Sequence, residues 1–77
     1  MLEKLLEIIA DVFMLSDDQV EGISYDTHFV IDLDADSLDL AEIAVSVEDV
    51  FDIKVDEEES DCWKTVRDVI KTIENHI

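Results

Sequence analysis

Apolar residues recur at helical spacing in three stretches of the chain. The first stretch, residues 2–15, places leucine, isoleucine, valine and phenylalanine at intervals of three and four residues, which predicts an amphipathic helix ending near Leu15. The second stretch, residues 37–51, has the same spacing. The third follows Thr65-x-x-Asp68, a pair typical of a helix N-terminus, and its apolar stripe continues to the end of the sequence. We therefore predict three main helices.

Two regions between these helices lack a long apolar stripe. Residues 16–35 contain the only glycine and five aspartates, which predicts a long loop with room for one short turn. Residues 57–63 predict a helix of one or two turns. The chain is therefore expected to be all-α, a small four-helix bundle of three main helices and one short helix in a single domain, residues 1–77. Five apolar side chains are expected to hold the long loop against the core: Ile23, Tyr25, Phe29, Ile31 and Leu33.

The second predicted helix has two unlike faces when its residues are placed at intervals of about 100°. One face is predicted to be buried and contains Leu40, Ile43, Ala44, Val47, Val50 and Phe51. The opposite face carries three apolar residues among three carboxylates: Leu38, Ala41 and Val45 with Glu42, Glu48 and Asp49. Apolar side chains on such a face are either scattered surface residues, which are common, or the centre of a docking surface.

Charge narrows the range of partners. The chain has 22 acidic and 5 basic residues, a net charge of −17. Nucleic acids and anionic membranes are bound through Lys and Arg, so we expect neither, whereas proteins with basic patches are favoured. No apolar run approaches the roughly 18 residues that span a membrane, and no signal-peptide pattern is present. We therefore expect a cytoplasmic monomer without membrane insertion. Cys62, the only cysteine, is interpreted as a small half-buried residue beside Trp63.

Ser37 is the candidate functional residue. A nucleophilic serine needs a nearby base, but the only histidines are His28, nine residues upstream, and His76, near the end of the sequence. We therefore predict that the protein is not an enzyme. Asp36 is a good N-cap with Asp39 in the supporting position, so Ser37 begins the helix and its hydroxyl points outward, where phosphate esters are favourable. Ser37 is then either part of a helix cap or the attachment point for a group added by another enzyme.

The same region also suggests a different class of protein, an acidic calcium-binding or interaction module. Residues 32–36, Asp-x-Asp-x-Asp, match the opening of a calcium-binding helix–loop–helix loop. The following positions do not fit, because Ser37 stands where glycine is needed, Asp39 where an apolar residue is usual, and Ile43 where the bidentate glutamate belongs. We therefore predict no specific metal site, while loose binding of divalent cations stays open.

The same residues resemble the signature of a known family. Residues 32–39, Asp-Leu-Asp-Ala-Asp-Ser-Leu-Asp, resemble the Asp-Leu-Gly-Ala-Asp-Ser-Leu-Asp motif of acyl carrier proteins. Residues 47–53, Val-Glu-Asp-Val-Phe-Asp-Ile, are similar to that family's stretch ending in Phe-Gly-Ile. Residues 65–69, Thr-Val-Arg-Asp-Val, resemble the Thr-Val-Gly-Asp-Ala that opens its last helix. The resemblance covers nearly the whole chain.

The resemblance implies a four-helix fold and a carrier function. It implies that a phosphopantetheinyl transferase moves 4'-phosphopantetheine from coenzyme A onto the hydroxyl of Ser37, and that the thiol of this arm holds acyl chains as thioesters. Fatty acid biosynthesis is the pathway expected first, and a specialised polyketide, aminoacyl or lipid-modification carrier is the alternative. The resemblance also implies docking on basic patches of acyl-processing enzymes through Asp36, Leu38, Asp39, Ala41, Glu42, Val45, Glu48 and Asp49.

Two residues depart from the family's pattern. Asp34 replaces the glycine before Ala-Asp-Ser, and Asp52 replaces the glycine of Phe-Gly-Ile. Glycine adopts left-handed backbone angles without strain, and aspartate tolerates them better than most residues. We therefore expect the fold to be kept, and the two departures are the reason to retain a specialised carrier as the alternative.

Overall fold

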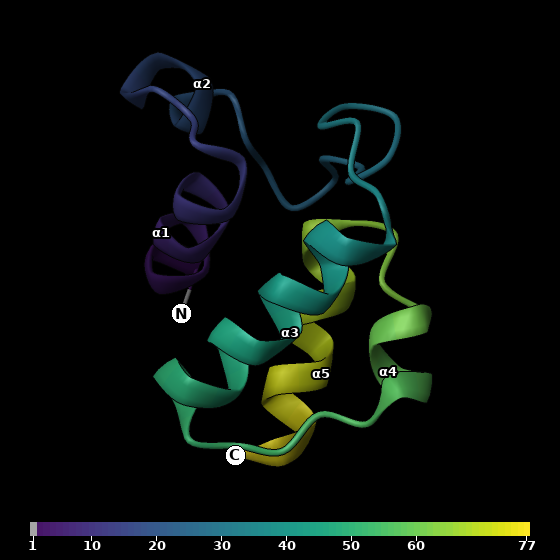
Figure 1. Ribbon diagram of the computed structural model, residues 1–77. Helices are drawn as coiled ribbons and strands as arrows, with labels where there is room; N and C mark the ends of the chain where they lie inside the picture. The colour runs from purple at the N-terminus through teal and green to yellow at the C-terminus, as the bar shows by residue number, and fades with distance from the viewer. Residues whose placement is uncertain (1) are drawn as a thin grey trace.

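The computed structural model describes residues 2–77, and within them it contains five helices and no strand (Figure 1). The all-α class and the three predicted main helices are confirmed. Figure 1 shows α1, α3 and α5 forming the bundle, with α4 on the side of α3 away from α1. The helices are α1 (Leu2–Phe13), α2 (Asp17–Glu21), α3 (Ser37–Phe51), α4 (Glu57–Asp61) and α5 (Val66–His76).

The core is built from the apolar stripes of the three long helices. Residues three and four positions apart share one side of a helix, so each stripe can turn toward the centre. The buried helical residues are Leu5, Ile8 and Ile9 of α1, Ile43 and Val47 of α3, and Val66, Val69, Ile70 and Ile73 of α5. Phe29, Ala35 and Trp63 complete the core from segments between helices. The predicted burial of Val50 is wrong: it is 47% exposed, because it lies at the edge of its stripe.

The segment between α1 and α3 contains a helix where only a turn was predicted. The first helix ends at Phe13, slightly before the expected Leu15. A second helix, α2, then starts after Ser16, whose Oγ accepts a hydrogen bond from Gln19 N at 3.4 Å while Ser16 N donates to Gln19 Oε1 at 2.9 Å. Ser-x-x-Gln is a recognised capping box, so the sequence did carry the signal for this helix.

The rest of this segment is fixed to the start of α5. Arg67 N donates to Tyr25 O at 2.9 Å, and the Arg67 guanidinium lies 5.4 Å from the centre of the Tyr25 ring. Phe29 is fully buried, which confirms it as an anchor, but Tyr25 is exposed and Ile31 is 78% exposed. Neither side chain is therefore buried against the core as predicted; Tyr25 holds the segment through its contacts with Arg67 instead. The remaining two predicted anchors are half-buried: Ile23 and Leu33.

Candidate functional site

Two aspartates close the first turn of α3. Asp36 has extended backbone angles (φ −110°, ψ −177°), and its Oδ1 accepts a hydrogen bond from Asp39 N at 2.9 Å. In return, Asp36 N donates to Asp39 Oδ2 at 3.2 Å. This capping box satisfies two backbone N–H groups that a helix start leaves without partners. It makes Ser37 the first helical residue, as predicted.

Ser37 is exposed and opens on a cleft between α3 and α4. The cleft has a volume of about 410 Å³ and is lined by Ser37, Leu40, Ala41, Glu57, Ser60 and Asp61. Leu40 and Ala41 of α3 contribute apolar surface to the cleft, and Glu57, Ser60 and Asp61 of α4 contribute its polar side. The cleft gives a group attached to Ser37 space beside the bundle without displacing buried side chains.

Neither histidine is placed to activate Ser37. His28 Nδ1 accepts hydrogen bonds from Val30 N at 3.1 Å and Ile31 N at 3.2 Å, and His76 Nε2 lies 3.0 Å from a carboxylate oxygen of Glu59. Figure 1 shows the end of α5, which carries His76, far from the start of α3. Because an activated serine needs a base within hydrogen-bond reach, Ser37 is not arranged as a nucleophile.

A phosphodiester fits the position of Ser37. The N–H groups of Ser37 and Leu38 lie at the positive end of α3, where negative charge is stabilised. The carboxylates of Asp36 and Asp39 accept backbone hydrogen bonds within the cap. The Ser37 hydroxyl would supply the ester oxygen of the attached group.

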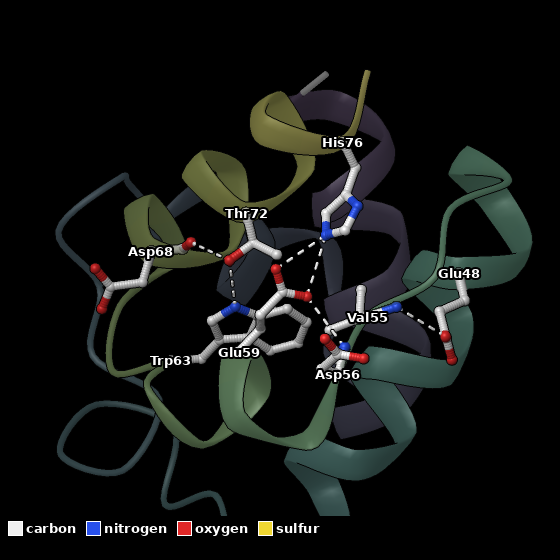
Figure 2. Close-up of polar contacts among 8 residues, drawn as sticks. All are labelled: Glu48, Val55, Asp56, Glu59, Trp63, Asp68, Thr72 and His76. Carbon is white, nitrogen blue, oxygen red and sulfur yellow. Dashed lines mark hydrogen bonds and ion pairs between the residues drawn. The ribbon is translucent and has the colours of Figure 1, made fainter.

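Three side-chain contacts hold α4, which forms one wall of the cleft, and the residues on either side of it against neighbouring helices (Figure 2). Toward α5, Trp63 Nε1 donates to Thr72 Oγ1 at 2.9 Å, and Glu59 Oε1 pairs with His76 Nε2 at 3.0 Å. Toward α3, Glu48 Oε2 accepts a hydrogen bond from Val55 N at 2.9 Å, in the segment leading into α4. The sequence pattern did not predict these contacts, although a buried tryptophan usually needs a partner for its N–H.

Glu59 has a second role at the start of α4. Its Oε2 accepts a hydrogen bond from Asp56 N at 3.0 Å. This bond, together with the contact to His76, lowers the pKa of the Glu59 carboxyl below its usual value. The charged carboxylate is therefore the form that joins the first turn of α4 to the end of α5.

The predicted docking face of α3 is exposed at its apolar centre. Leu38 is 67% exposed and Val45 is 58% exposed, and Ala41, Glu42 and Asp49 are exposed as well. The face continues onto α1, because a groove of about 500 Å³ between the two helices is lined by Asp11, Val12, Leu38, Ala41, Glu42, Val45 and Ser46. The α1 residues were missed, since no periodicity within one helix shows which neighbour lies beside it.

Three carboxylates of the predicted docking set have structural partners. Asp39 is half-buried and caps α3, while Glu48 is half-buried and binds Val55 N. Asp36, also in the set, is exposed but accepts the capping hydrogen bond from Asp39 N. Glu42 and Asp49 thus remain the members of the set whose carboxylates are exposed and lie outside these contacts.

Asp34 and Asp52 both have left-handed backbone angles. The φ angle is 54° at Asp34 and 53° at Asp52, the region that glycine adopts without strain. Asp52 ends α3, where its N–H donates to Glu48 O. Both aspartates adopt this region, and the fold is kept as expected.

Other candidate sites add little. Within residues 2–77, no group of three or more histidine, cysteine or carboxylate side chains could hold a metal ion. None of the helices described in Figure 1 is long and apolar enough to cross a membrane. Cys62 is exposed rather than half-buried as predicted, because it lies at the C-terminal cap of α4.

Comparison with known proteins agrees with this geometry. Residues 3–73 match the family model described as a phosphopantetheine attachment site. An acyl carrier protein of Clostridium perfringens is 37% identical over 76 residues, which cover 99% of this chain and 96% of the relative. The chain belongs to the acyl carrier protein family. A second acyl carrier protein, from Sulfurovum sp., is 39% identical over 69 residues, 90% of this chain and 88% of that protein.

A solved structure shows the same family likeness. A Mycobacterium tuberculosis structure described as an acyl carrier protein has a TM-score of 0.84 and 29% identity, covering 95% of this chain and 93% of that one. As a member of the acyl carrier protein family, the chain is a carrier and not an enzyme, and its cofactor is covalently attached 4'-phosphopantetheine. Such carriers interact with acyl-processing enzymes. The predicted family, carrier role and cofactor are confirmed.

Proposed function

We propose that Ser37 Oγ is the attachment point for 4'-phosphopantetheine and that the chain presents acyl intermediates to the enzymes of fatty acid biosynthesis. The observation that carries the assignment is the exposed position of Ser37 at the start of a capped helix, opening on a cleft. The bound arm supplies a terminal thiol that holds acyl groups as thioesters. The chain's own contribution is to fix the ester oxygen on a rigid helix end.

Two other serines differ from Ser37 in their contacts. Ser60 lines the same cleft, but its hydroxyl donates to Glu57 O at 3.1 Å within α4. Ser16 uses its hydroxyl in the cap of α2. Ser37 is thus the serine of the cleft that combines exposure with the first position of a long helix.

Intact mass spectrometry tests the attachment. The chain is incubated with coenzyme A and a broad-specificity phosphopantetheinyl transferase. Wild type should gain one phosphopantetheine, Ser37→Ala should gain none, and the matched variant Ser60→Ala should gain one like wild type. A Ser37→Ala protein that still gains the mass would refute the assignment of Ser37, and a wild type that gains none would favour an interaction module.

We also propose that partner enzymes use their basic patches to dock on one face of α3. The apolar centre is formed by Leu38, Ala41 and Val45, and apolar anchors inside a charged rim are typical of protein interfaces. The exposed carboxylates of Glu42 and Asp49 give this rim its negative charge, and a field of this sign accelerates encounters with basic surfaces. The proposed docking set is Asp36, Leu38, Asp39, Ala41, Glu42, Val45, Glu48 and Asp49.

The proposal also includes the pathway. The support for fatty acid biosynthesis is the near full-length similarity to relatives named simply as acyl carrier proteins. Loading with malonyl groups and elongation by purified fatty-acid enzymes would be expected, and failure of both would favour the specialised carrier.

We also propose a cytoplasmic location and a monomeric state. The exposed free thiol of Cys62 suits the reducing cytoplasm. The net charge of −17 favours a monomer, which the mass measured by light scattering would check.

A further inference from the structure

Two neighbouring apolar residues are exposed in the segment that leads into α3. Val30 is 51% exposed and Ile31 is 78% exposed, whereas Phe29 beside them is fully buried. Figure 1 shows this segment looping above the first turn of α3. Neither exposed side chain belongs to the core or packs against it, so core packing does not explain an isoleucine at this position.

Hydrogen bonds hold the apolar pair in one fixed arrangement. His28 Nδ1 accepts hydrogen bonds from Val30 N at 3.1 Å and from Ile31 N at 3.2 Å. His28 N in turn donates to Asp32 Oδ2 at 2.7 Å. Asp34 N donates to Val30 O at 3.1 Å, which brings the end of the turn back to the pair. A surface that is ordered in advance loses less conformational entropy when a partner binds it.

Asp34 connects the apolar pair to the proposed attachment point. Three peptide units separate Asp34 from Ser37, so their Cα atoms are no more than about 11 Å apart at about 3.8 Å per unit. The carboxylates of Asp36 and Asp39 accept hydrogen bonds within the cap of α3. The Asp34 side chain is exposed and lies outside these contacts. Its negative charge is therefore available to a partner that approaches Ser37.

We propose that Val30, Ile31 and Asp34 form a second docking surface, the loop surface, for the phosphopantetheinyl transferase that modifies Ser37. This inference rests on the proposed attachment at Ser37. An enzyme that holds Ser37 Oγ in its active site must cover the surface around that residue. An interface of standard size takes about 800 Å² from each partner, which is about one sixth of the 5050 Å² accessible surface of this chain. Such a footprint extends beyond α3 onto the preceding turn.

The composition of the loop surface fits a partner with a basic rim around an apolar contact. Val30 and Ile31 supply apolar area that a partner can remove from water. Asp34 and the exposed Asp32 place negative charge beside them. A second copy of the chain is disfavoured as the partner, because each copy has a net charge of −17. The loop surface contains no residue of the proposed docking set, which begins at Asp36.

Transfer kinetics test the apolar part of the loop surface. The chain is incubated with coenzyme A and a broad-specificity phosphopantetheinyl transferase, and the mass gain is followed at several carrier concentrations. Ile31→Ser should raise the KM for the carrier about fivefold through lost apolar burial, with kcat unchanged because the contact is the same in the ground and transition states. Ile77→Ser is the matched control, since Ile77 is 72% exposed and Figure 1 shows the C-terminus far from the start of α3. It should behave as wild type.

A second pair of variants tests the charge. Asp34→Gly and Asp52→Gly each remove one carboxylate and each replace a residue with left-handed backbone angles, φ 54° and 53°. Asp34→Gly should raise the KM about twofold to fivefold at low salt, the range for an exposed ion pair, and the difference should shrink as salt is added. Asp52→Gly should keep the wild-type KM. Thermal unfolding verifies that all four variants are folded.

Nuclear magnetic resonance shows the contact without the reaction. The Ser37→Ala carrier is titrated with the same transferase in the absence of coenzyme A, and the amide signals of Val30 and Ile31 should shift or broaden while that of Ile77 should not. Equal KM values within either pair of variants, or unchanged Val30 and Ile31 signals at saturation, would overturn the loop surface. A wild type that gains no mass would instead refute the attachment at Ser37, which is a separate failure.

Discussion

Asp36 and Asp39 exchange hydrogen bonds across the first turn of α3, at 2.9 Å from Asp39 N to Asp36 Oδ1 and at 3.2 Å from Asp36 N to Asp39 Oδ2. Ser37 stands between them in the sequence. The same pair therefore defines where the helix begins and which hydroxyl is presented at its end. Asp36 and Asp39, which the family motif suggests for docking, therefore also fix the helix end that carries Ser37.

Removal of this cap should destabilise the fold. Asp36→Ala leaves Asp39 N without its acceptor and is expected to lower the free energy of unfolding by about 1 kcal/mol. Asp36→Asn retains an acceptor and should lose much less. Urea unfolding at constant slope measures the difference as a shift of the midpoint. Equal midpoints for the alanine variant and wild type would contradict a structural role for the cap.

Relief of backbone strain at the end of α3 should stabilise the protein. At φ 53°, Asp52 has a left-handed conformation that costs a non-glycine residue about 1–2 kcal/mol. Asp52→Gly removes this strain but adds about 0.4–1 kcal/mol of conformational entropy to the unfolded chain, so a net gain of up to about 1.6 kcal/mol is expected. Asp52→Ala removes the same charge and keeps the strain, and should be less stable than the glycine variant by thermal unfolding. The reverse order would argue against strain at Asp52.

The buried hydrogen bond of Trp63 should be expensive to break. Thr72→Val replaces the hydroxyl by a methyl group of similar shape and leaves the indole N–H without an acceptor, which costs about 1–3 kcal/mol. Thr72→Ser keeps the acceptor and should stay close to wild type. The measurement is chemical unfolding followed by Trp63 fluorescence. A valine variant as stable as the serine variant would show that the hydrogen bond contributes nothing.

Asp68 should contribute stability that depends on pH. Burial alone would raise the pKa of its carboxyl, but hydrogen bonds from Lys64 N, Thr65 N and the Thr65 hydroxyl outweigh burial and lower it from 3.8. Because the folded pKa is the lower one, the contribution is fully present above about pH 4 and is lost as the pH falls through the folded pKa. The stability difference between wild type and Asp68→Asn should therefore shrink in acid. A difference that is constant from neutral pH to pH 2 would refute this.

Charge reversal on the docking face should slow recognition by the transferase. Glu42→Lys is expected to reduce the rate of transfer to Ser37 through slower association, with the largest effect at low salt. Glu74→Lys makes the same change of charge at an exposed position of α5 and serves as the control. Glu48→Lys is a poorer probe, because it also removes the acceptor for Val55 N. Equal rates for the Glu42 and Glu74 variants would mean that only net charge matters.

Local patterns in the sequence accounted for most of the helices. The spacing of apolar residues and the pair Thr65 and Asp68 gave the long helices, because both signals act within one or two turns. Periodicity gave the wrong burial for Val50, since a stripe has edges and only the neighbouring elements decide how far it is covered. Helix α2 departs from the predicted loop because Ser16 and Gln19 form a capping pair that starts a helix.

The sequence by itself determined that Ser37 starts an amphipathic helix, and that this helix carries apolar residues on an acidic face. These properties depend on residues a few positions apart, which backbone geometry places in fixed relation. Only the tertiary structure decided that Val12 joins Leu38 and Val45 in one groove, or that Trp63 finds Thr72. Such partners come from different helices, and their meeting depends on how the apolar stripes pack together.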